Sequence, residues 1–112
     1  MARTEFLGVI TVSVNLTKVE AAILQQLVAA AGSELYGLQM VDKDKGVKRG
    51  SIYVYLGRLI DKGFVESRLE TDSDLPTPRR LYKITATGVR QFRAQQAAEQ
   101  SYARAFNEAM AT

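Results

Sequence analysis

Large apolar residues recur at helical spacing in one segment near the middle of the chain. Between residues 49 and 62 they follow the i, i+4, i+7, i+8 pattern of a helix with one buried face: Ile52, Leu56, Leu59 and Ile60. Gly63 comes directly afterwards, in the position where a helix commonly ends on a glycine. The segments 64–70 and 80–84 then alternate like strands, and the prolines and aspartates between them predict a loop. The pattern therefore predicts a helix followed by a β-hairpin.

The first half of the chain predicts two further helices. Thr17 and Glu20 have the spacing of a capping box, and the helix after them buries one apolar stripe: Val19, Ile23, Leu24, Leu27 and Val28. Alanines extend this helix to residue 31, and a glycine ends it. Ser33 is placed to cap a second helix with four apolar residues: Leu35, Leu38, Met40 and Val41. Gly37 inside that helix costs about 1 kcal/mol relative to alanine, so we expect a close helix–helix approach there. Residues 42–46 form a charged turn.

The two ends of the chain predict different structures. In residues 1–16 a run of β-branched residues alternates with polar ones, which predicts a short strand or an extended arm, with a flexible tail as the alternative. Thr85 is placed to cap a last helix that reaches nearly to the C-terminus. Its large apolar residues stand among alanines: Val89, Phe92, Tyr102, Phe106 and Met110. The last three follow i, i+4, i+8 spacing beyond the reach of a small domain, so we expect a partner to cover them.

The predicted order is three helices, a strand, a loop, a strand and a long helix. This order is typical of a winged helix-turn-helix, a mainly α fold with a small β-hairpin wing, in which the third helix is the recognition helix. We expect three parts: an N-terminal arm over 1–16, a winged-helix DNA-binding domain over 17–84 and a C-terminal dimerisation helix over 85–112.

The amino-acid composition excludes several kinds of site chemistry but does not indicate one particular function. The 112 residues carry a net charge of +3 and contain neither cysteine nor histidine. Disulfides, thiolate chemistry, zinc sites with N or S ligands and imidazole catalysis are therefore excluded. No apolar run is long enough to span a bilayer or to form a signal peptide, so we expect a cytoplasmic protein. The mild positive charge is compatible with nucleic acid without requiring it.

The outward face of the predicted third helix is suited to a DNA groove. Opposite its apolar stripe it carries small residues, a hydroxyl and an arginine, with tyrosines at its flanks: Gly50, Ser51, Val54, Gly57, Arg58, Tyr53 and Tyr55. Small residues allow close approach, while hydroxyls and arginine offer donors to phosphates and base edges. Lys48 and Arg49 stand at the N-terminal end of the helix, where phosphate is favoured.

Several short segments in this order resemble the PadR-like winged-helix transcriptional regulators. They are Leu35-Tyr36-Gly37-Leu38, Gly50-Ser51-Ile52-Tyr53, Leu59 to Val65, and Pro78 to Thr85 with Gly88. The resemblance covers roughly residues 17–92. It implies a homodimer that binds an operator and is held together through the C-terminal helix and often the N-terminal one. It also implies that Tyr53 meets the DNA backbone and that Arg79 and Arg80 are basic wing residues. Arg49 departs from the family, which often has proline there, and the arm before Thr17 is unusually long and β-like.

These observations give two sets of candidate residues. For DNA binding they are Lys48, Arg49, Gly50, Ser51, Tyr53, Val54, Tyr55, Arg58, Arg79 and Arg80; for the dimer interface they are Phe92, Tyr102, Phe106 and Met110. Some of these residues also have a purely structural interpretation. The tyrosines are also suited to packing inside the domain, and the wing arginines to pairing with Asp72, Asp74 or Glu66. Arg90, Arg93 and Arg104 are interpreted as a solvated helix face.

We therefore expect a sequence-specific transcriptional regulator that represses by occupying a pseudo-palindromic operator as a homodimer. An architectural DNA-binding protein and a winged-helix module that binds another protein are the alternatives. We expect no enzyme activity, cofactor or metal, because the acidic residues of the loops are typical of solvation. The expected partners are double-stranded DNA and a second copy of the chain, without a membrane. Any small-molecule effector stays unidentified.

Overall fold

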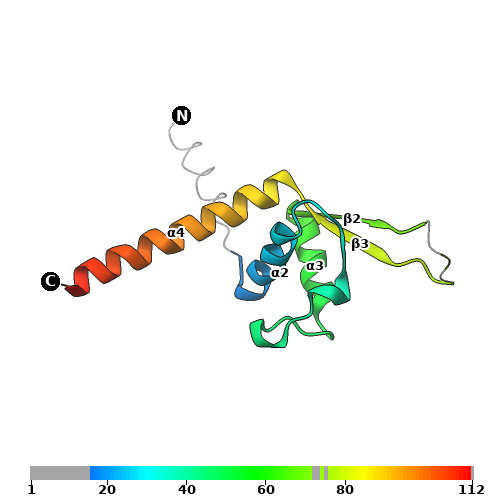
Figure 1. The fold of residues 1–112 in the computed structure, drawn as a ribbon, viewed down its shortest axis with the longest axis horizontal. Coiled ribbons are helices and arrows are strands. Elements are labelled where there is room, and N and C mark those ends of the chain that lie inside the picture. The colour runs from blue at the N-terminus through cyan, green and yellow to red at the C-terminus, as the bar shows by residue number, and fades with distance from the viewer. Residues whose placement is uncertain (1–15, 72–73, 75, 112) are drawn as a thin grey trace.

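The computed structural model describes residues 16–71, 74 and 76–111 (Figure 1). The elements follow one another as α2 (Lys18–Ala29), β1 (Leu35–Tyr36), η1 (Gly37–Met40), η2 (Lys43–Lys45), α3 (Ile52–Asp61), β2 (Val65–Leu69), β3 (Arg80–Ile84) and α4 (Ala86–Ala111). The strands form an antiparallel sheet in the order β1-β3-β2. The arm predicted over 1–16 lies outside the described residues, apart from Leu16.

The capping box at the start of α2 is confirmed. The Glu20 amide donates to the Thr17 hydroxyl over 3.1 Å, and the Thr17 amide donates to the Glu20 carboxylate over 2.9 Å. The end of the helix was placed two residues too late. Helical structure stops at Ala29 because Ala31 and Gly32 both adopt positive φ, at 55° and 88°, and turn the chain away.

The second predicted helix is wrong. Leu35 and Tyr36 form strand β1, which pairs with Leu81 and Tyr82 of β3, and the rest of the predicted helix is the short 3₁₀ helix η1. Pairing with a free edge of the hairpin satisfies backbone groups that a short helix would leave open. Gly37 is nevertheless closely approached: a Cβ on it would lie 2.6 Å from the Tyr53 ring, so the neighbour is a side chain of α3.

The third helix and the hairpin are confirmed, with a shifted start. Helix α3 begins at Ile52 instead of residue 49, because a turn closed by the Ile52 amide on the Lys48 carbonyl precedes it. Gly63 adopts a φ of 80° just after the helix, as its position predicted. Strands β2 and β3 pair from Val65 opposite Ile84 to Leu69 opposite Arg80.

The core lies between α2, α3 and one face of the sheet. Its fully buried residues come from the centre of each helix stripe and from the segment between the two helices: Ile23, Leu24, Leu27, Met40, Val47, Ile52, Leu56 and Leu59. Val19, Val28 and Ile60 of the stripes are partly buried against them. The start of α4 is fixed to this body because the Thr85 hydroxyl donates to the Gly63 carbonyl over 2.7 Å and the Thr85 amide donates to the Phe64 carbonyl over 3.0 Å. A Cβ on Gly88 would overlap the Phe64 carbonyl oxygen, so the helix is pressed against the start of β2.

Helix α4 then leaves the body. Figure 1 shows it projecting as a single rod, and every described residue from 96 to 111 is exposed. None of the helices in the described part of the chain is both long and apolar enough to cross a membrane.

Candidate nucleic-acid interface

Helix α3 divides cleanly into a buried and an open face. Ile52, Leu56 and Leu59 are fully buried, whereas Tyr53 and Val54 keep 53% and 55% of their surface exposed. Glycines at 50 and 57 have open space where a Cβ would stand. The outward face is therefore low and accessible, as close approach to a groove requires.

Arg58 is held over this face by an aromatic neighbour. Its guanidinium carbon lies 5.3 Å from the centre of the Tyr55 ring, a cation–π distance. The Tyr55 ring is half-buried and packs against the core. Tyr55 therefore packs inside the domain, as the alternative interpretation of the sequence held, and its ring also contacts the exposed Arg58 side chain.

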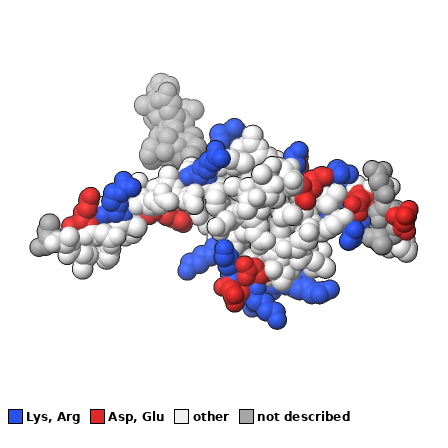
Figure 2. Space-filling view, viewed as in Figure 1, with Lys and Arg blue, Asp and Glu red and all other residues white. Residues whose placement is uncertain are grey.

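The entry to α3 carries the other basic residues. Lys48 and Arg49 are exposed in the turn that precedes the helix. Figure 2 shows basic side chains along the lower edge of the molecule, over the loop that leads into α3, with acidic side chains among them. Asp42 belongs to that loop, where its carboxylate accepts from the Asp44 amide. The surface is mixed in charge, with cations at its outer margin.

The wing arginines have partners that differ from those considered in the sequence. Arg79 donates to the Tyr36 hydroxyl over 2.9 Å and lies 3.5 Å from a Glu70 carboxylate oxygen. Arg80 donates to the Ser67 hydroxyl over 3.0 Å. Glu70 was missed as a partner because its opposition to Arg79 depends on the register of the hairpin. Tyr36 was missed because it was assigned to a helix.

A hollow of about 560 Å³ lies between α3 and the base of the wing. It is lined by the residues of η1 and its neighbours, by the start of β3 and by Tyr53: Tyr36, Gly37, Leu38, Gln39, Tyr53, Pro78, Arg79, Arg80 and Tyr82. We call this space the wing-base hollow. Burial raises the pKa of Tyr82, so its phenol stays protonated at neutral pH. The hollow joins the two parts of the surface predicted to meet DNA, with a tyrosine from α3 on one side and two arginines on the other.

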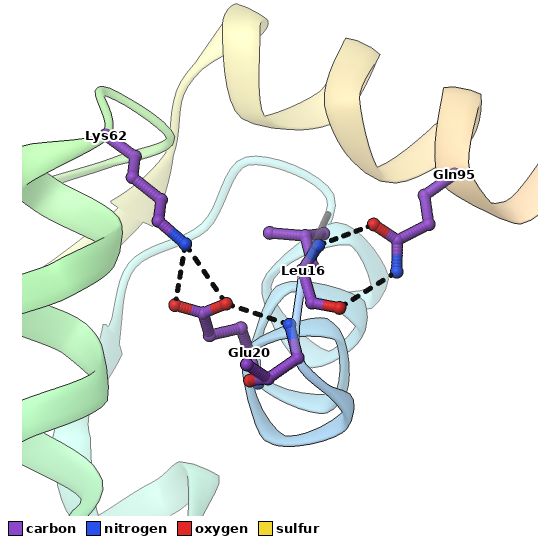
Figure 3. A network of polar contacts seen from close by, with 5 residues as sticks. Leu16, Glu20, Lys62 and Gln95 are labelled. Carbon is purple, nitrogen blue, oxygen red and sulfur yellow. Dashed lines mark hydrogen bonds and ion pairs between the residues drawn. The ribbon is translucent and has the colours of Figure 1, made fainter. Parts of the chain in front are cut away.

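A buried ion pair fixes the two helices of the motif to each other (Figure 3). The Lys62 ammonium donates to both carboxylate oxygens of Glu20, at 3.0 and 3.2 Å, and only 1% of the Glu20 side chain is exposed. Burial alone would raise the pKa of Glu20, but the hydrogen bonds from Thr17 and the charge of Lys62 outweigh it and lower that pKa. Glu20 therefore stays ionised and ties the start of α2 to the end of α3.

Helix α4 is tied to the same place by a side-chain amide. Gln95 accepts from the Leu16 amide over 2.7 Å and donates to the Leu16 carbonyl over 3.2 Å (Figure 3). Beside this contact a second hollow, of about 520 Å³, lies between α2 and α4. Phe92 lines it and also packs against the core, so this predicted interface residue is partly engaged within its own chain.

The family to which the chain belongs follows from its sequence and its fold together. The model of the transcriptional regulator PadR-like family matches residues 23–94. This segment runs from α2 through the wing into the first part of α4. The chain belongs to the PadR-like family of transcriptional regulators. Its winged-helix fold and the resemblance seen in its sequence are thereby confirmed.

Solved structures of PadR-like regulators share this fold. One from Bacillus cereus is 26% identical, with a TM-score of 0.62 over 82% of this chain and 90% of that one. One from Clostridium difficile is 15% identical, with a TM-score of 0.65 over 84% and 99%. Bacillus subtilis PadR, solved with operator DNA, is 24% identical, with a TM-score of 0.58 over 70% of this chain and 46% of that one. Curated protein sequences gave no match.

The distal part of α4 lies beyond the segment that the PadR-like model matches. Its three large apolar residues are all exposed, with Tyr102 at 76%, Phe106 at 55% and Met110 at 70%. In Figure 2 uncharged atoms dominate this part of the helix. A solvated helix normally turns polar residues outward, so this exposed apolar row is the unusual feature of distal α4.

Proposed function

We propose that this PadR-like chain is a homodimeric repressor that binds a pseudo-palindromic operator through α3 and the wing. The observation that supports this most directly is the open face of α3, which stands opposite a fully buried stripe. A rigid helix with one exposed, low face is what the major groove admits. Within this proposal residues 17–84 are the DNA-binding part and residues 85–112 the dimerisation helix.

The proposed contacts divide into positioning and reading. Lys48 and Arg49 stand at the entry to α3, where phosphates are the nearest groups on DNA. Arg58 lies one turn beyond Val54 on the outward face, supported by the Tyr55 ring, and a long side chain there reaches base edges. Operator binding by Bacillus subtilis PadR supports the proposal by its shared fold.

The proposed dimer is formed by the exposed row on distal α4. Tyr102, Phe106 and Met110 repeat every fourth residue, so they lie along one side of the helix. A second copy would bury the same row by symmetry. Two recognition helices would then enter successive major grooves about 34 Å apart and exclude other proteins from the site.

Salt dependence tests DNA binding first. Six to ten phosphate contacts by a dimer would cost roughly 10³–10⁵ in affinity between 50 and 200 mM salt. Selection of bound DNA from a random pool first gives the preferred duplex and the operator sequence. Fluorescence anisotropy then measures the affinity for that duplex at each salt concentration. Weak binding with a flat salt response would support the protein-partner alternative and refute the proposal.

Two variants test the division of roles. Arg58→Ala should cost about 1–3 kcal/mol on the selected duplex and relax sequence preference, whereas Lys48→Ala should weaken selected and scrambled duplexes equally. Arg93→Ala, on the exposed side of α4, removes the same charge and serves as control. An equal loss on both duplexes for Arg58→Ala would assign Arg58 to phosphate contact instead.

A further inference from the structure

Three side chains from three different strand ends meet at the base of the wing. Tyr36 belongs to β1, Glu70 follows β2 directly, and Arg79 directly precedes β3. The Tyr36 hydroxyl donates to the Glu70 carboxylate over 2.6 Å and accepts from Arg79 over 2.9 Å. The Arg79 guanidinium carbon also lies 3.9 Å from the centre of the Tyr36 ring. We call these three residues the wing-base cluster.

The backbone holds the cluster as firmly as the side chains do. The Glu70 amide donates to the Arg79 carbonyl over 2.7 Å, which extends the ladder of β2 and β3 by one pair. Tyr36 is fixed from the other edge of the sheet, where it pairs with Leu81. The position of the Arg79 side chain is therefore set by three strands and not by the loop between β2 and β3.

The two charged residues of the cluster differ in their exposure to solvent: Arg79 is more exposed than Glu70. One oxygen of Glu70 is buried without a hydrogen-bond partner among the described residues, and its nearest cation is Arg79 at 3.5 Å. The Glu70 side chain as a whole is 22% exposed, but its buried oxygen favours a nearby positive charge, so Glu70 helps to retain Arg79 in place. The Arg79 side chain itself remains 51% exposed and lines the wing-base hollow.

A guanidinium held in this way can bind a second anion on its open side. It has five N–H donors in a planar fork, and a single nitrogen, Nη2, makes both its hydrogen bond to Tyr36 and its ion pair with Glu70. Because its rotamer is already fixed, it loses little entropy when a ligand arrives. Tyr53 and Arg80 line the same hollow, so a phosphate there would find a hydroxyl and two cations.

We propose that the wing-base hollow receives one backbone phosphate of DNA, and that Tyr36 and Glu70 are positioning residues that hold Arg79 toward it. This inference rests on the proposed DNA-binding function and adds two residues that do not themselves touch DNA. It explains why an acidic residue stands beside an arginine on a surface that meets phosphates. Glu70 removes some positive charge from the surface but fixes the geometry of the charge that remains.

A double-mutant cycle tests this inference. Tyr36→Phe keeps the ring and removes the hydroxyl, while Glu70→Gln keeps the shape and removes the charge. Each is measured for binding to the selected duplex at low salt, with Arg79 intact and in an Arg79→Ala background. With Arg79 intact, each should weaken binding by roughly 3- to 10-fold and lower the salt slope by about 0.9 for each phosphate that is no longer neutralised. With Arg79→Ala, neither should change affinity by more than about 2-fold.

The matched control is Glu66→Gln on strand β2. It removes the same charge from the same hairpin, but its residue pairs across the strands with Lys83 and not with Arg79. It should raise affinity slightly because it only reduces repulsion of phosphates. Thermal unfolding of every variant shows whether the wing base remains folded.

Other results overturn the inference in distinct ways. If Glu70→Gln raises affinity in both backgrounds, Glu70 acts only by repelling DNA. If Glu70→Gln and Tyr36→Phe lower affinity equally in both backgrounds, they act on the fold of the wing and not through Arg79. A wild-type chain that binds DNA but gives either result overturns this inference alone. A wild-type chain that binds no duplex overturns the proposed function and this inference together.

Discussion

The winged-helix body buries most of its large apolar residues, whereas the distal part of α4 exposes its own. In the body, the central residues of the apolar stripes of α2 and α3 have no exposed surface, the flanking stripe residues are partly buried, and the sheet covers one side of them. In α4 beyond residue 95, every described residue is exposed, including the apolar row of Tyr102, Phe106 and Met110. The body buries its large apolar residues within one chain, whereas distal α4 leaves Tyr102, Phe106 and Met110 exposed.

The difference shows what stabilises each region. Tertiary packing supports the body, with capping and one buried ion pair at its joints. The distal helix has good local propensity, with mainly alanine, arginine and glutamate between the large residues. An isolated helix is marginal in water even with such a sequence, so burial of its apolar row by a partner would supply most of its stability.

The largest expected effect comes from charging the distal row. Burial contributes about 1.5–3 kcal/mol for each large apolar side chain. Replacing Tyr102 and Phe106 by glutamate should thus weaken association by about 10⁴-fold or more, since both protomers lose both residues. Sedimentation velocity at micromolar concentration gives the measurement.

The control for this change charges other positions of the same helix. Gln100→Glu and Asn107→Glu add the same charge away from the apolar row and should leave association nearly unchanged. A wild-type chain that sediments as a folded monomer would refute the dimer and the contrast between the two regions.

Next in size is a cavity in the body. Leu56→Ala should lower the free energy of unfolding by about 2–5 kcal/mol, because Leu56 is fully buried. Val54→Ala, on the exposed side of the same helix, should change it by less than about 0.5 kcal/mol. Urea denaturation at one protein concentration compares them, since the proposed dimerisation would add to the measured value. Equal losses would show that the open face of α3 is covered in solution.

The buried ion pair should give a smaller, pH-dependent effect. Lys62→Met leaves the Glu20 carboxylate buried without its cation and should cost about 2 kcal/mol at pH 7, less than a fully buried pair because Lys62 is partly exposed. The lowered pKa of Glu20 makes its contribution complete above the ordinary value near 4.5 and lost as pH falls below it. The difference between variant and wild type should therefore shrink between pH 5 and pH 3.

Urea midpoints across that pH range give the measurement. Lys43→Met, an exposed lysine of η2, serves as control and should show no such trend. A difference that stays constant down to pH 3 would mean that Lys62 acts by packing alone.

The smallest effect is expected at the junction of the two regions. The Thr85 hydroxyl accepts from the Gly88 amide and donates to the Gly63 carbonyl over 2.7 Å. Thr85→Ala should lower the free energy of unfolding by about 1 kcal/mol, as loss of a helix cap does. The dimer dissociation constant should barely change, because the junction lies far along the helix from Phe106. Loss of dimer without loss of stability would place the interface near the junction.

The sequence by itself determined the features that depend on near neighbours. Thr17 and Glu20 stand three residues apart and form their capping box. In the stripe of the third helix Ile52, Leu56 and Leu59 are fully buried as the spacing predicts, and Ile60 is partly buried. Gly63 ends the helix, and the prolines after residue 75 fall in the loop between β2 and β3. Such features can be predicted from the sequence because they depend on a few residues within one or two helical turns.

The tertiary structure decided the contacts between distant residues. Strand β1 exists because β3 offers it an edge, so the local pattern around Leu35 misleadingly favoured a helix. Lys62 and Glu20 are 42 residues apart, Tyr36 and Glu70 are 34 apart, and Leu16 and Gln95 are 79 apart. No local period encodes these pairs, because each requires other elements to pack first. One helix face suggested the residues proposed to read DNA, but the contacts of Tyr36 and Glu70 with Arg79 were set by the packing of the whole domain.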